Sequence, residues 1–478
     1  MYIVIFIIIA IVCFFVFDKK KEKRKLTAKG KVISGIIALV LLIIGGVSVE
    51  KIYASSDSYE KTRNDGNFYN LWSPINQYIE RGTIYSFLHS YSSIKIEKPQ
   101  GYNKNEAENM LSEYTYDNIE EDKKVNVIGI MLEAYNDFSK FDEIEFLNDP
   151  YEKIHKLEEE SYSGELVTNI FAAGIVDTER KFLTGYSTLP SLRKETNSYV
   201  KYFKEQGYYT EGSHPGYEWF YNRLNINKNL GFDNYYFSEN KYEEYSKDYI
   251  AEDDVVMSEI LFLYRQHKEN FNTPYFSFNV TYQNHGPYLD TKADGKEYLV
   301  RKDGYTNAEC NIFDNYMNGI EDTGEQIYKL VEELRDDSGP VVLILFGDHN
   351  PWLGNDNSVY NMLGIDFDLS TEEGATNYYD TPYIIWANDK AKEVLQNNFM
   401  GKGEKISPSY LMNKFFELAG YGGNEFMKAS NDLRKNVQAI NSVFYLENNV
   451  YASELSDESK KMLDKFYKMQ YYWIYDKK

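Results

Sequence analysis

The side chains most able to do chemistry stand directly after apolar segments of the sequence. Glu133 follows the run Val125–Leu132, and Asp348 and His349 follow the run Val341–Phe346 after a single glycine. An Asp-His pair alone would more simply lie in a helix-capping loop, but a second carboxylate at the end of another apolar run favours a shared cation. Two carboxylates and one imidazole suit manganese, magnesium or zinc better than copper or an iron–sulfur cluster. We therefore expect Glu133, Asp348 and His349 to bind one divalent metal.

Two further histidines follow segments with the character of strands. His285 comes after Tyr275–Tyr282, and His214 comes after the weaker candidate Gly207–Thr210. An imidazole titrates near neutral pH, so at such a place it can exchange protons with a substrate or bind a metal. Position at a strand end is by itself only weak evidence that a histidine belongs to a functional site. Three other histidines lie in helical or loop surroundings and are expected to be structural, namely His89, His155 and His267.

The elements that must position these residues follow an α/β pattern. Continuous apolar stretches, which are typical of strands covered on both faces, occur at Val125–Leu132, Tyr275–Tyr282, Val341–Phe346 and Tyr383–Trp386. Helical patterns between or after them cover Tyr199–Gln206, Asp253–Asn270, Asn311–Asp336 and Ile406–Tyr421, and Val437–Val450 resembles short strands or irregular chain. Strands that alternate with helices predict a mostly parallel central sheet flanked by helices. Open sheets of this kind bind ligands beyond the carboxyl ends of their strands.

The amino-terminal part carries two uncharged apolar stretches, Tyr2–Phe17 and Val32–Val49. Eighteen helical residues rise about 27 Å, close to the thickness of the hydrocarbon core of a bilayer. A cleaved signal peptide fits less well, because the basic cluster follows the first apolar run. That cluster, Asp18–Lys31, holds eight basic residues against two acidic ones, so we place it in the cytoplasm. We expect two transmembrane helices, a multi-pass location in the cell membrane, and an extracytoplasmic chain from Glu50 onward.

The composition excludes several other classes of protein. The 478 residues carry a net charge of −22, which argues against a nucleic-acid partner. Hydrophobic residues make up 43% of the chain and aromatic residues 16%, far too many for a disordered polymer. The two cysteines, Cys13 and Cys310, are too few for a disulfide-stapled scaffold or a cysteine-rich metal site.

Seven segments form an ordered series along the outer part of the chain. They are Gly101-Tyr102 in KPQGY, NVIGIMLEAYNDF (126–138), DTERKFLTG (177–185), GSHPGYEWFYNRLNINKNLGF (212–232), NHGPY (284–288), FGDHNP (346–351) and TPYIIWAN (381–388). The series resembles the lipoteichoic acid synthase family, a membrane-anchored branch of the alkaline phosphatase/sulfatase superfamily. The patterns and the resemblance together predict four parts of the chain. Residues 1–49 form two transmembrane helices joined by the cytoplasmic loop 18–31, and residues 50–123 form an extracytoplasmic helical linker. Residues 124–435 form a sulfatase-like domain, and residues 436–478 form a carboxyl-terminal subdomain.

The resemblance also implies roles for individual residues. Glu133, Asp348 and His349 match the metal ligands of the family, which are usually described as binding manganese. His285 matches its active-site histidine near the phosphate. Arg223, in FYNR, matches an arginine that contacts the substrate phosphate, a task suited to a planar guanidinium.

The substrate side of this pattern departs from the family at two positions. Tyr221 stands where the family has a tryptophan, and Gly216 stands where an acidic substrate contact often occurs. We place Tyr221 and His214 with Arg223 among the substrate-binding residues. The end of the pocket that would receive glycerol phosphate is therefore expected to differ.

The nucleophile position departs further. The family uses a threonine there, whereas this chain has Ile175, which offers no oxygen to attack phosphorus or bind a metal. Three explanations are open. Thr178, one helical turn later, could attack instead, although it would more simply support the turn. The metal could activate a water molecule for direct hydrolysis, or the chain could be catalytically silent.

The sequence thus predicts a metal-dependent phosphoryl-group transferase or phosphoesterase that is anchored in the membrane. Its expected partner is an anionic phospholipid or a glycerol-phosphate polymer, and its catalytic candidates are Thr178 and His285. The alternative is a silent sulfatase-fold protein that binds the same envelope molecules. Sulfate-ester hydrolysis is discounted, because neither Cys13 nor Cys310 lies in the required C/S-x-P-x-R segment.

Overall fold

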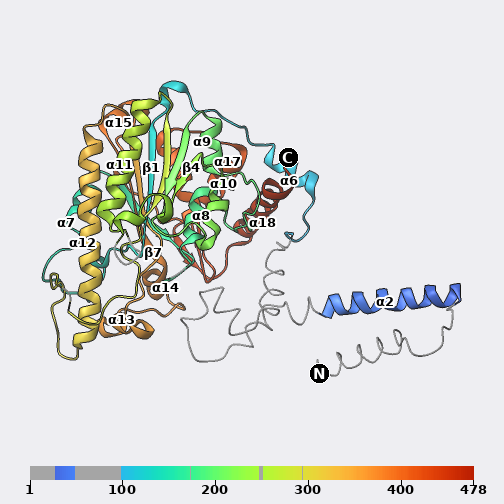
Figure 1. Cartoon of the computed structure of the whole chain (residues 1–478), viewed down its shortest axis with the longest axis horizontal. Coiled ribbons are helices and arrows are strands. Elements are labelled where there is room, and N and C mark those ends of the chain that lie inside the picture. Colours follow the sequence, from blue (N-terminus) through green and yellow to red (C-terminus); the bar gives the residue numbers. More distant parts are fainter. Residues whose placement is uncertain (1–26, 49–97, 173, 247–250, 293, 478) are drawn as a thin grey trace. The chain divides into compact units, whose positions relative to one another are not determined.

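The computed structural model describes residues 27–48, 98–172, 174–246, 251–292 and 294–477, which fall into two units, Met1–Ile96 and Glu97–Lys478. In the first unit the described residues form helix α2 (Ala28–Ser48), which includes most of the predicted span Val32–Val49 (Figure 1). Among the described residues, no helix is both long and apolar enough to cross a membrane. The predicted transmembrane helix is therefore not confirmed, and the other predicted span, Tyr2–Phe17, lies outside the described residues.

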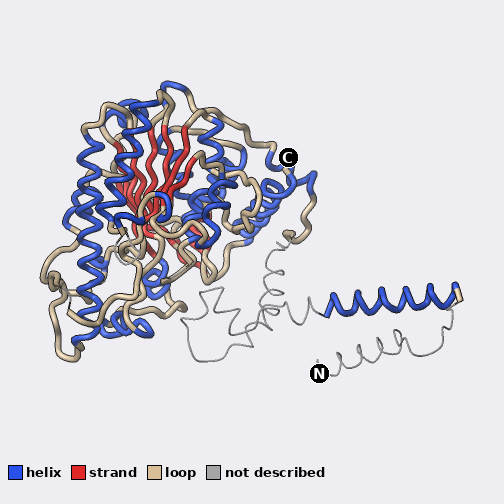
Figure 2. Tube along the Cα trace, in the orientation of Figure 1, coloured by secondary structure: helices blue, strands red, loops and turns tan. Residues whose placement is uncertain are grey.

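The second unit is built on a central sheet of eight strands. The strands are β1 (Asn126–Leu132), β2 (Tyr162–Val167), β3 (Tyr209–Ser213), β4 (Asn234–Tyr236), β5 (Tyr275–Val280), β6 (Val341–Gly347), β7 (Asp380–Ala387) and β8 (Gly401–Lys402). Their order across the sheet is β4-β3-β5-β1-β6-β7-β2-β8. All pairings are parallel except those that β7 makes with β6 and β2. These pairings confirm the predicted α/β class with a mostly parallel sheet, and Figure 2 shows the strands between helices.

The long apolar runs form the middle of this sheet. Strand β1 lies between β5 and β6, with Met131 opposite Val280 and Leu132 opposite Gly347. All residues of β5 and β6 are buried, as expected for strands covered on both faces. Strands β2, β4 and β8 were not predicted, because β4 and β8 have only three and two residues, and β2, although six residues long, is partly exposed over its first four positions.

Helices cover both faces of the sheet (Figure 1). Helices α7 (Glu152–Glu158), α11 (Asp253–Asn270), α12 (Asn307–Arg335) and α13 (Ser358–Leu363) pack on one face. Helices α8 (Val176–Thr184), α9 (Tyr199–Glu205), α10 (Arg223–Leu230), α15 (Asp389–Leu395) and α16 (Leu411–Ala419) pack on the other. Helix α11 has the predicted bounds, whereas α12 begins earlier than predicted, because the Thr306 side chain caps it by accepting from the Glu309 N–H.

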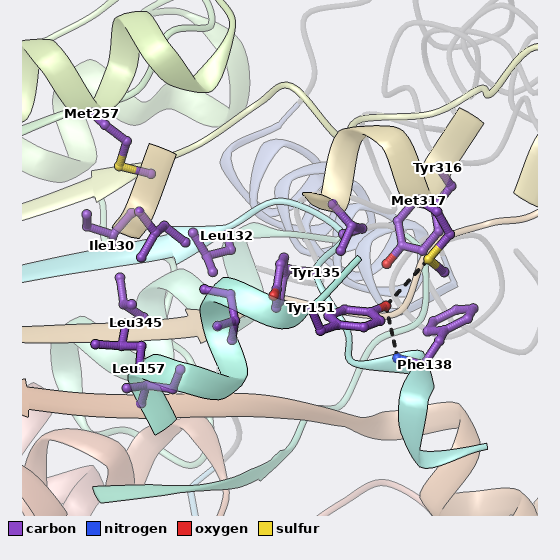
Figure 3. Packing of buried hydrophobic residues seen from close by; sticks show 14 of the residues in the cluster. Ile130, Leu132, Tyr135, Phe138, Tyr151, Leu157, Met257, Tyr316, Met317 and Leu345 are labelled. Carbon is purple, nitrogen blue, oxygen red and sulfur yellow. Dashed lines mark hydrogen bonds between the residues drawn. The ribbon is translucent and has the colours of Figure 1, made fainter. Parts of the chain in front are cut away.

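The core on the α12 face continues into the loop that follows β1. Ile130 and Leu132 of β1 and Leu345 of β6 belong to the same cluster as Leu157 of α7 and Met257 of α11 (Figure 3). The buried Tyr151 hydroxyl accepts a 3.0 Å hydrogen bond from the Phe138 N–H and donates one of 2.9 Å to the Asn136 carbonyl oxygen. These bonds hold the chain beyond Glu133 against the core.

The carboxyl-terminal part packs on the same unit. Helix α14 (Glu372–Tyr379) precedes β7, and α17 (Glu425–Arg434) leads into a small antiparallel sheet of β9 (Val437–Ile440), β10 (Tyr445–Glu447) and β11 (Val450–Ala452). Helix α18 (Asp457–Tyr471) and helix α6 (Lys104–Leu111) share a cluster in which the Phe426 ring stacks on Phe466 and on Trp473. The aromatic segment 466–475 packs within this cluster.

Candidate active site

Three ligand-type side chains meet at the carboxyl edge of the central strands. Glu133 follows β1, and Asp348 and His349 follow β6, which is its parallel neighbour. Gly347 makes the close approach between the two loops possible, since a Cβ atom there would lie 2.1 Å from the Tyr135 carbonyl oxygen. The sheet topology therefore brings together residues that are more than 200 positions apart in the sequence.

The geometry of these three residues fits a cation. One ligand atom from each lies within 4.8 Å of the others. The His349 Nε2 atom is 3.8 Å from Glu133 Oε1 and 3.4 Å from Asp348 Oδ2. All three side chains are buried, and Glu133 Oε2, Asp348 Oδ2 and His349 Nε2 have no hydrogen-bond partner among the described residues. Buried polar atoms seldom lack a partner, and a divalent cation satisfies all three at once.

Neighbouring groups orient the ligand atoms. Asp348 Oδ1 accepts hydrogen bonds from the Ala134 N–H at 2.8 Å and from the His349 N–H at 2.7 Å, which leaves Oδ2 free. His349 Nδ1 lies 2.9 Å from the Asn350 carbonyl oxygen. A carbonyl can only accept, so Nδ1 carries the proton and Nε2 presents its lone pair to the site.

The electrostatics of the site also call for a positive charge. Burial and repulsion by Asp348 raise the pKa of Glu133 well above its ordinary value, and the nearby charge of Arg223 opposes this shift. Burial raises the pKa of Asp348 as well, against the opposing effect of His349. Two buried carboxylates with raised pKa values are expensive to ionise without a cation between them. The residues present therefore fit a divalent metal.

Arg223 places a buried guanidinium beside this site. Its side chain is buried at the start of α10, and its Nε and Nη2 atoms donate to Glu179 Oε2 at 3.1 and 3.0 Å. Its Nη1 atom has no partner within the described parts of the chain. The guanidinium lies 5.5 Å from the ring centroid of Tyr221, so Tyr221 helps to hold it. Glu179 was not singled out in the sequence, although it belongs to the segment DTERKFLTG.

The two histidines differ in environment. His285 is exposed, and its Nδ1 lies 2.7 Å from the Gly286 carbonyl oxygen. His214 is buried, its Nδ1 accepts from the Gly216 N–H at 2.8 Å, and burial together with the charge of Arg223 holds its pKa well below the ordinary value. His214 is therefore neutral at neutral pH. A Cβ atom at Gly216 would lie 2.4 Å from the His214 ring, so this ring leaves no room for an acidic side chain at position 216.

The position at which the family resemblance expects a nucleophile lies at the start of α8. Ile175 immediately precedes the helix, is buried, and belongs to the apolar cluster on that face of the sheet. Thr178 is also buried, and its hydroxyl donates a 2.8 Å hydrogen bond to the main-chain carbonyl oxygen of Asp348. The Thr178 hydroxyl thus contacts the backbone of the loop that carries Asp348 and His349. This geometry favours the supporting role over the role of substitute nucleophile.

A buried network behind the His285 segment was not predicted. Asp253, the first residue of α11, accepts a 2.6 Å hydrogen bond from the Thr323 hydroxyl, which in turn accepts one of 2.9 Å from Asn284 Nδ2. Burial raises the pKa of Asp253 to about 7. The three residues come from separate parts of the chain, so no local pattern in the sequence could have linked them.

Comparison with known proteins agrees with this architecture. A family model described as sulfatase matches residues 125–421. A protein of Rhizobium meliloti (strain 1021), provisionally named a cyclic beta-1,2-glucan modification protein, is 24% identical over 366 residues, which are 73% of this chain. The match covers 54% of that protein, so the chain spans about half the length of this curated relative.

Solved structures share the fold. The phosphoglycerol transferase GacH of Streptococcus pyogenes, solved in complex with sn-glycerol-1-phosphate, superposes with a TM-score of 0.61 at 19% identity, over 80% of this chain and 96% of that one. The lipoteichoic acid synthase LtaP of Listeria monocytogenes superposes with a TM-score of 0.52 at 15% identity, over 76% and 97%. At these identities the likeness concerns the fold.

Proposed function

Because the chain belongs to the sulfatase family, as its resemblance to the lipoteichoic acid synthase branch indicated, we propose that it is a metal-dependent phosphoryl-group transferase or phosphoesterase. The substrate class is an anionic envelope phospholipid, with phosphatidylglycerol as the donor of glycerol phosphate. One observation carries the proposal: the unpartnered ligand atoms of Glu133, Asp348 and His349 converge in a buried site near Arg223. The names of the similar structures, a phosphoglycerol transferase and a lipoteichoic acid synthase, point to the same substrate class.

Each residue has a role in this proposal. Glu133, Asp348 and His349 would hold one divalent cation, manganese in the first instance and magnesium or zinc as alternatives, which polarises phosphoryl oxygens and lowers the pKa of nearby water. Arg223, positioned by Glu179, binds the phosphate through Nη1. His285 and the neutral His214 line the substrate side, with Tyr221 beside the guanidinium.

The chemical step proposed here does not use a protein nucleophile at position 175. The oxygen of a water molecule or of an acceptor hydroxyl forms the new bond to phosphorus. The bond from phosphorus to the diacylglycerol oxygen breaks, and the proton of the attacking hydroxyl ends on that oxygen. We assign Thr178 to positioning, because its hydroxyl is bonded to the Asp348 carbonyl oxygen.

A release assay tests the proposal. The full chain is incubated with manganese and fluorescent phosphatidylglycerol, and released diacylglycerol is measured. We expect release by the unchanged chain and by Glu143→Ala, which alters an exposed glutamate, and none by Glu133→Ala. Absence of release by the unchanged chain in manganese, magnesium and zinc would contradict the proposal.

The second candidate function is binding without catalysis. Ile175 favours binding without catalysis, because this buried isoleucine occupies the place where the family that the chain resembles has its nucleophile. In that case the chain would bind phosphatidylglycerol vesicles or a glycerol-phosphate polymer without releasing diacylglycerol. Vesicle binding that depends on Arg223, combined with silence in the release assay, would identify this function.

The proposal includes an extracytoplasmic location at the cell membrane, because the enzyme must reach phospholipid headgroups. The anchor would lie within residues 1–49, as the sequence predicts. Protease treatment of intact cells should then remove the unit Glu97–Lys478 from the cell surface. Protection of this unit in intact cells, with cleavage after lysis, would contradict the location.

A further inference from the structure

A cavity of about 940 Å³ lies at the β2–β8 edge of the central sheet. Its walls come from β2, from the segment Gly401–Lys405, from the loop after β1 and from the small carboxyl-terminal sheet. The metal-ligand candidates Glu133, Asp348 and His349 are not among its lining residues. Its volume lies within the range of about 300–1,000 Å³ that is usual for pockets that hold small molecules. The proposed phospholipid chemistry does not use this cavity.

The charges on the wall define what the cavity can hold. Three lysines line it, Lys140, Lys402 and Lys405, against six carboxylates, Asp137, Glu158, Glu159, Glu165, Glu372 and Glu404. An excess of carboxylates disfavours a phosphate polymer or another anion. Several of these charges are already paired, as Lys405 is with Glu165 at 3.2 Å and with the buried Asp380. Because of this pairing, the wall does not present a concentrated negative charge that would bind a small cation.

Neutral hydroxyl groups fit this wall better than either kind of ion. A hydroxyl donates to carboxylates and accepts from ammonium groups, and both are present along the cavity together with the amide of the exposed Asn449. The half-buried ring of Tyr451 adds a flat apolar surface with a polar tip. Many hydrogen-bonding groups of both kinds beside an aromatic ring are suited to a polyhydroxylated ring compound.

The cavity also adjoins the loops of the metal site. Asn136, on its wall, donates through Nδ2 to the side-chain oxygen of Asn350, which is the residue after His349. Asn350 Nδ2 donates in turn to the Tyr378 carbonyl oxygen at 3.0 Å. One pair of amides thus forms part of the wall between the cavity and the loop that carries two of the metal-ligand candidates.

We propose that this cavity is a second binding site, and that its ligand is a neutral oligosaccharide. The inference does not depend on the phosphoester chemistry, because it rests on the cavity and its lining alone.

The test is a binding titration of the full chain with neutral tetrasaccharides of glucose, of N-acetylglucosamine and of galactose. Binding is measured by isothermal titration calorimetry or by ligand-observed NMR. At least one tetrasaccharide should bind. Lys402→Ala and Glu165→Gln should each weaken that binding by about tenfold, because each removes a charged hydrogen-bonding partner. Matched controls are Lys390→Ala and Glu143→Gln, which alter exposed residues outside the cavity and should bind as the unchanged chain does.

Other outcomes would overturn the proposal. They are failure of all three tetrasaccharides to bind, equal binding by the cavity variants and the controls, or preferential binding of a glycerol-phosphate trimer. Thermal unfolding of each variant shows whether it is folded, and Lys402, an exposed residue, can be changed with little effect on the core. Glu133→Ala should keep its tetrasaccharide binding, so failure of the proposed phosphoester function and failure of this site give different results.

Discussion

The hydroxyl of Thr178 donates a 2.8 Å hydrogen bond to the main-chain carbonyl oxygen of Asp348. Both residues are fully buried, so the bond that joins helix α8 to the loop carrying Asp348 and His349 is shielded from solvent. The carbonyl belongs to the same residue whose side chain contributes to the candidate metal site and whose Oδ2 atom has no hydrogen-bond partner among the described residues. The placement of Asp348 therefore depends on α8. Ile175 immediately precedes the same helix.

Thr178→Val tests whether this hydroxyl supports the loop. The variant keeps the side-chain shape but leaves the Asp348 carbonyl oxygen without its partner, which should lower the free energy of unfolding by about 1–3 kcal/mol. We expect weaker manganese binding and reduced but measurable diacylglycerol release, with recovery of both in Thr178→Ser. Complete loss of release in Thr178→Val with unchanged manganese affinity would instead indicate a nucleophile.

Glu133→Gln tests the metal site without relying on catalysis. Manganese should raise the unfolding temperature of the unchanged chain, because it binds the native state and relieves the repulsion between Glu133 and Asp348. The variant loses one anionic ligand, so the shift produced by manganese should fall sharply, and a chelator should have little further effect. The same shift in Glu133→Gln as in the control Glu143→Gln would exclude Glu133 as a ligand.

Ile175→Thr and Ile175→Val form a matched pair at the nucleophile position. Both side chains are β-branched and similar in size, and only threonine carries an oxygen. If the backbone at the start of α8 is already suited to a nucleophile, Ile175→Thr should form a covalent phospho-enzyme that mass spectrometry detects after incubation with phosphatidylglycerol. Ile175→Val should form none. A phospho-enzyme in the unchanged chain would show that another residue attacks.

Arg223→Lys tests the anion-binding group. Lysine cannot bond to Glu179 and to a phosphate with the fixed geometry of a guanidinium. We expect the KM for phosphatidylglycerol to rise by about tenfold or more, since a charge-assisted hydrogen bond contributes about 1.5–3 kcal/mol. Lys228→Arg, on the same helix, serves as a control for a basic substitution. An unchanged KM in Arg223→Lys would remove Arg223 from the substrate site.

Asp253→Asn tests the buried network beneath His285. Burial raises the pKa of Asp253 from 3.8 to about 7. Between these values the native state holds a proton that the unfolded chain has lost, so this group makes the free energy of unfolding fall as pH rises toward 7. Asparagine does not titrate. The variant should therefore gain stability relative to the unchanged chain from pH 5 to pH 8, by about 3 kcal/mol at most.

The pKa of Asp380 is raised in the same direction as that of Asp253. Its contribution to the pH dependence of stability is the same in the unchanged chain and in Asp253→Asn, so it cancels in the difference between them. Thr323 keeps an acceptor in Asp253→Asn, so the hydrogen bond behind Asn284 can persist. A stability difference that stays constant over this pH range would show that Asp253 does not titrate as the structure indicates.

Part of this architecture could be predicted from local patterns. Val125–Leu132 and Val341–Phe346 are apolar throughout because their strands are buried on both faces, and burial leaves a direct trace in residue type. Since parallel strands end at one edge, the polar residues that follow them can be grouped from their positions in the sequence alone. Glu133, Asp348 and His349 are indeed adjacent in the structure.

The tertiary structure decided the contacts between those groups and the rest of the chain. The bond from Thr178 to the Asp348 backbone, the pairing of Glu179 with Arg223, and the network of Asp253 each join segments that local periodicity does not relate. The same holds for the cavity at the β2–β8 edge, because β8 has only two residues and β2 lacks a continuous apolar run that could be recognised in the sequence. Residue type records burial and strand ends, whereas hydrogen-bond partners and cavities depend on how distant segments pack.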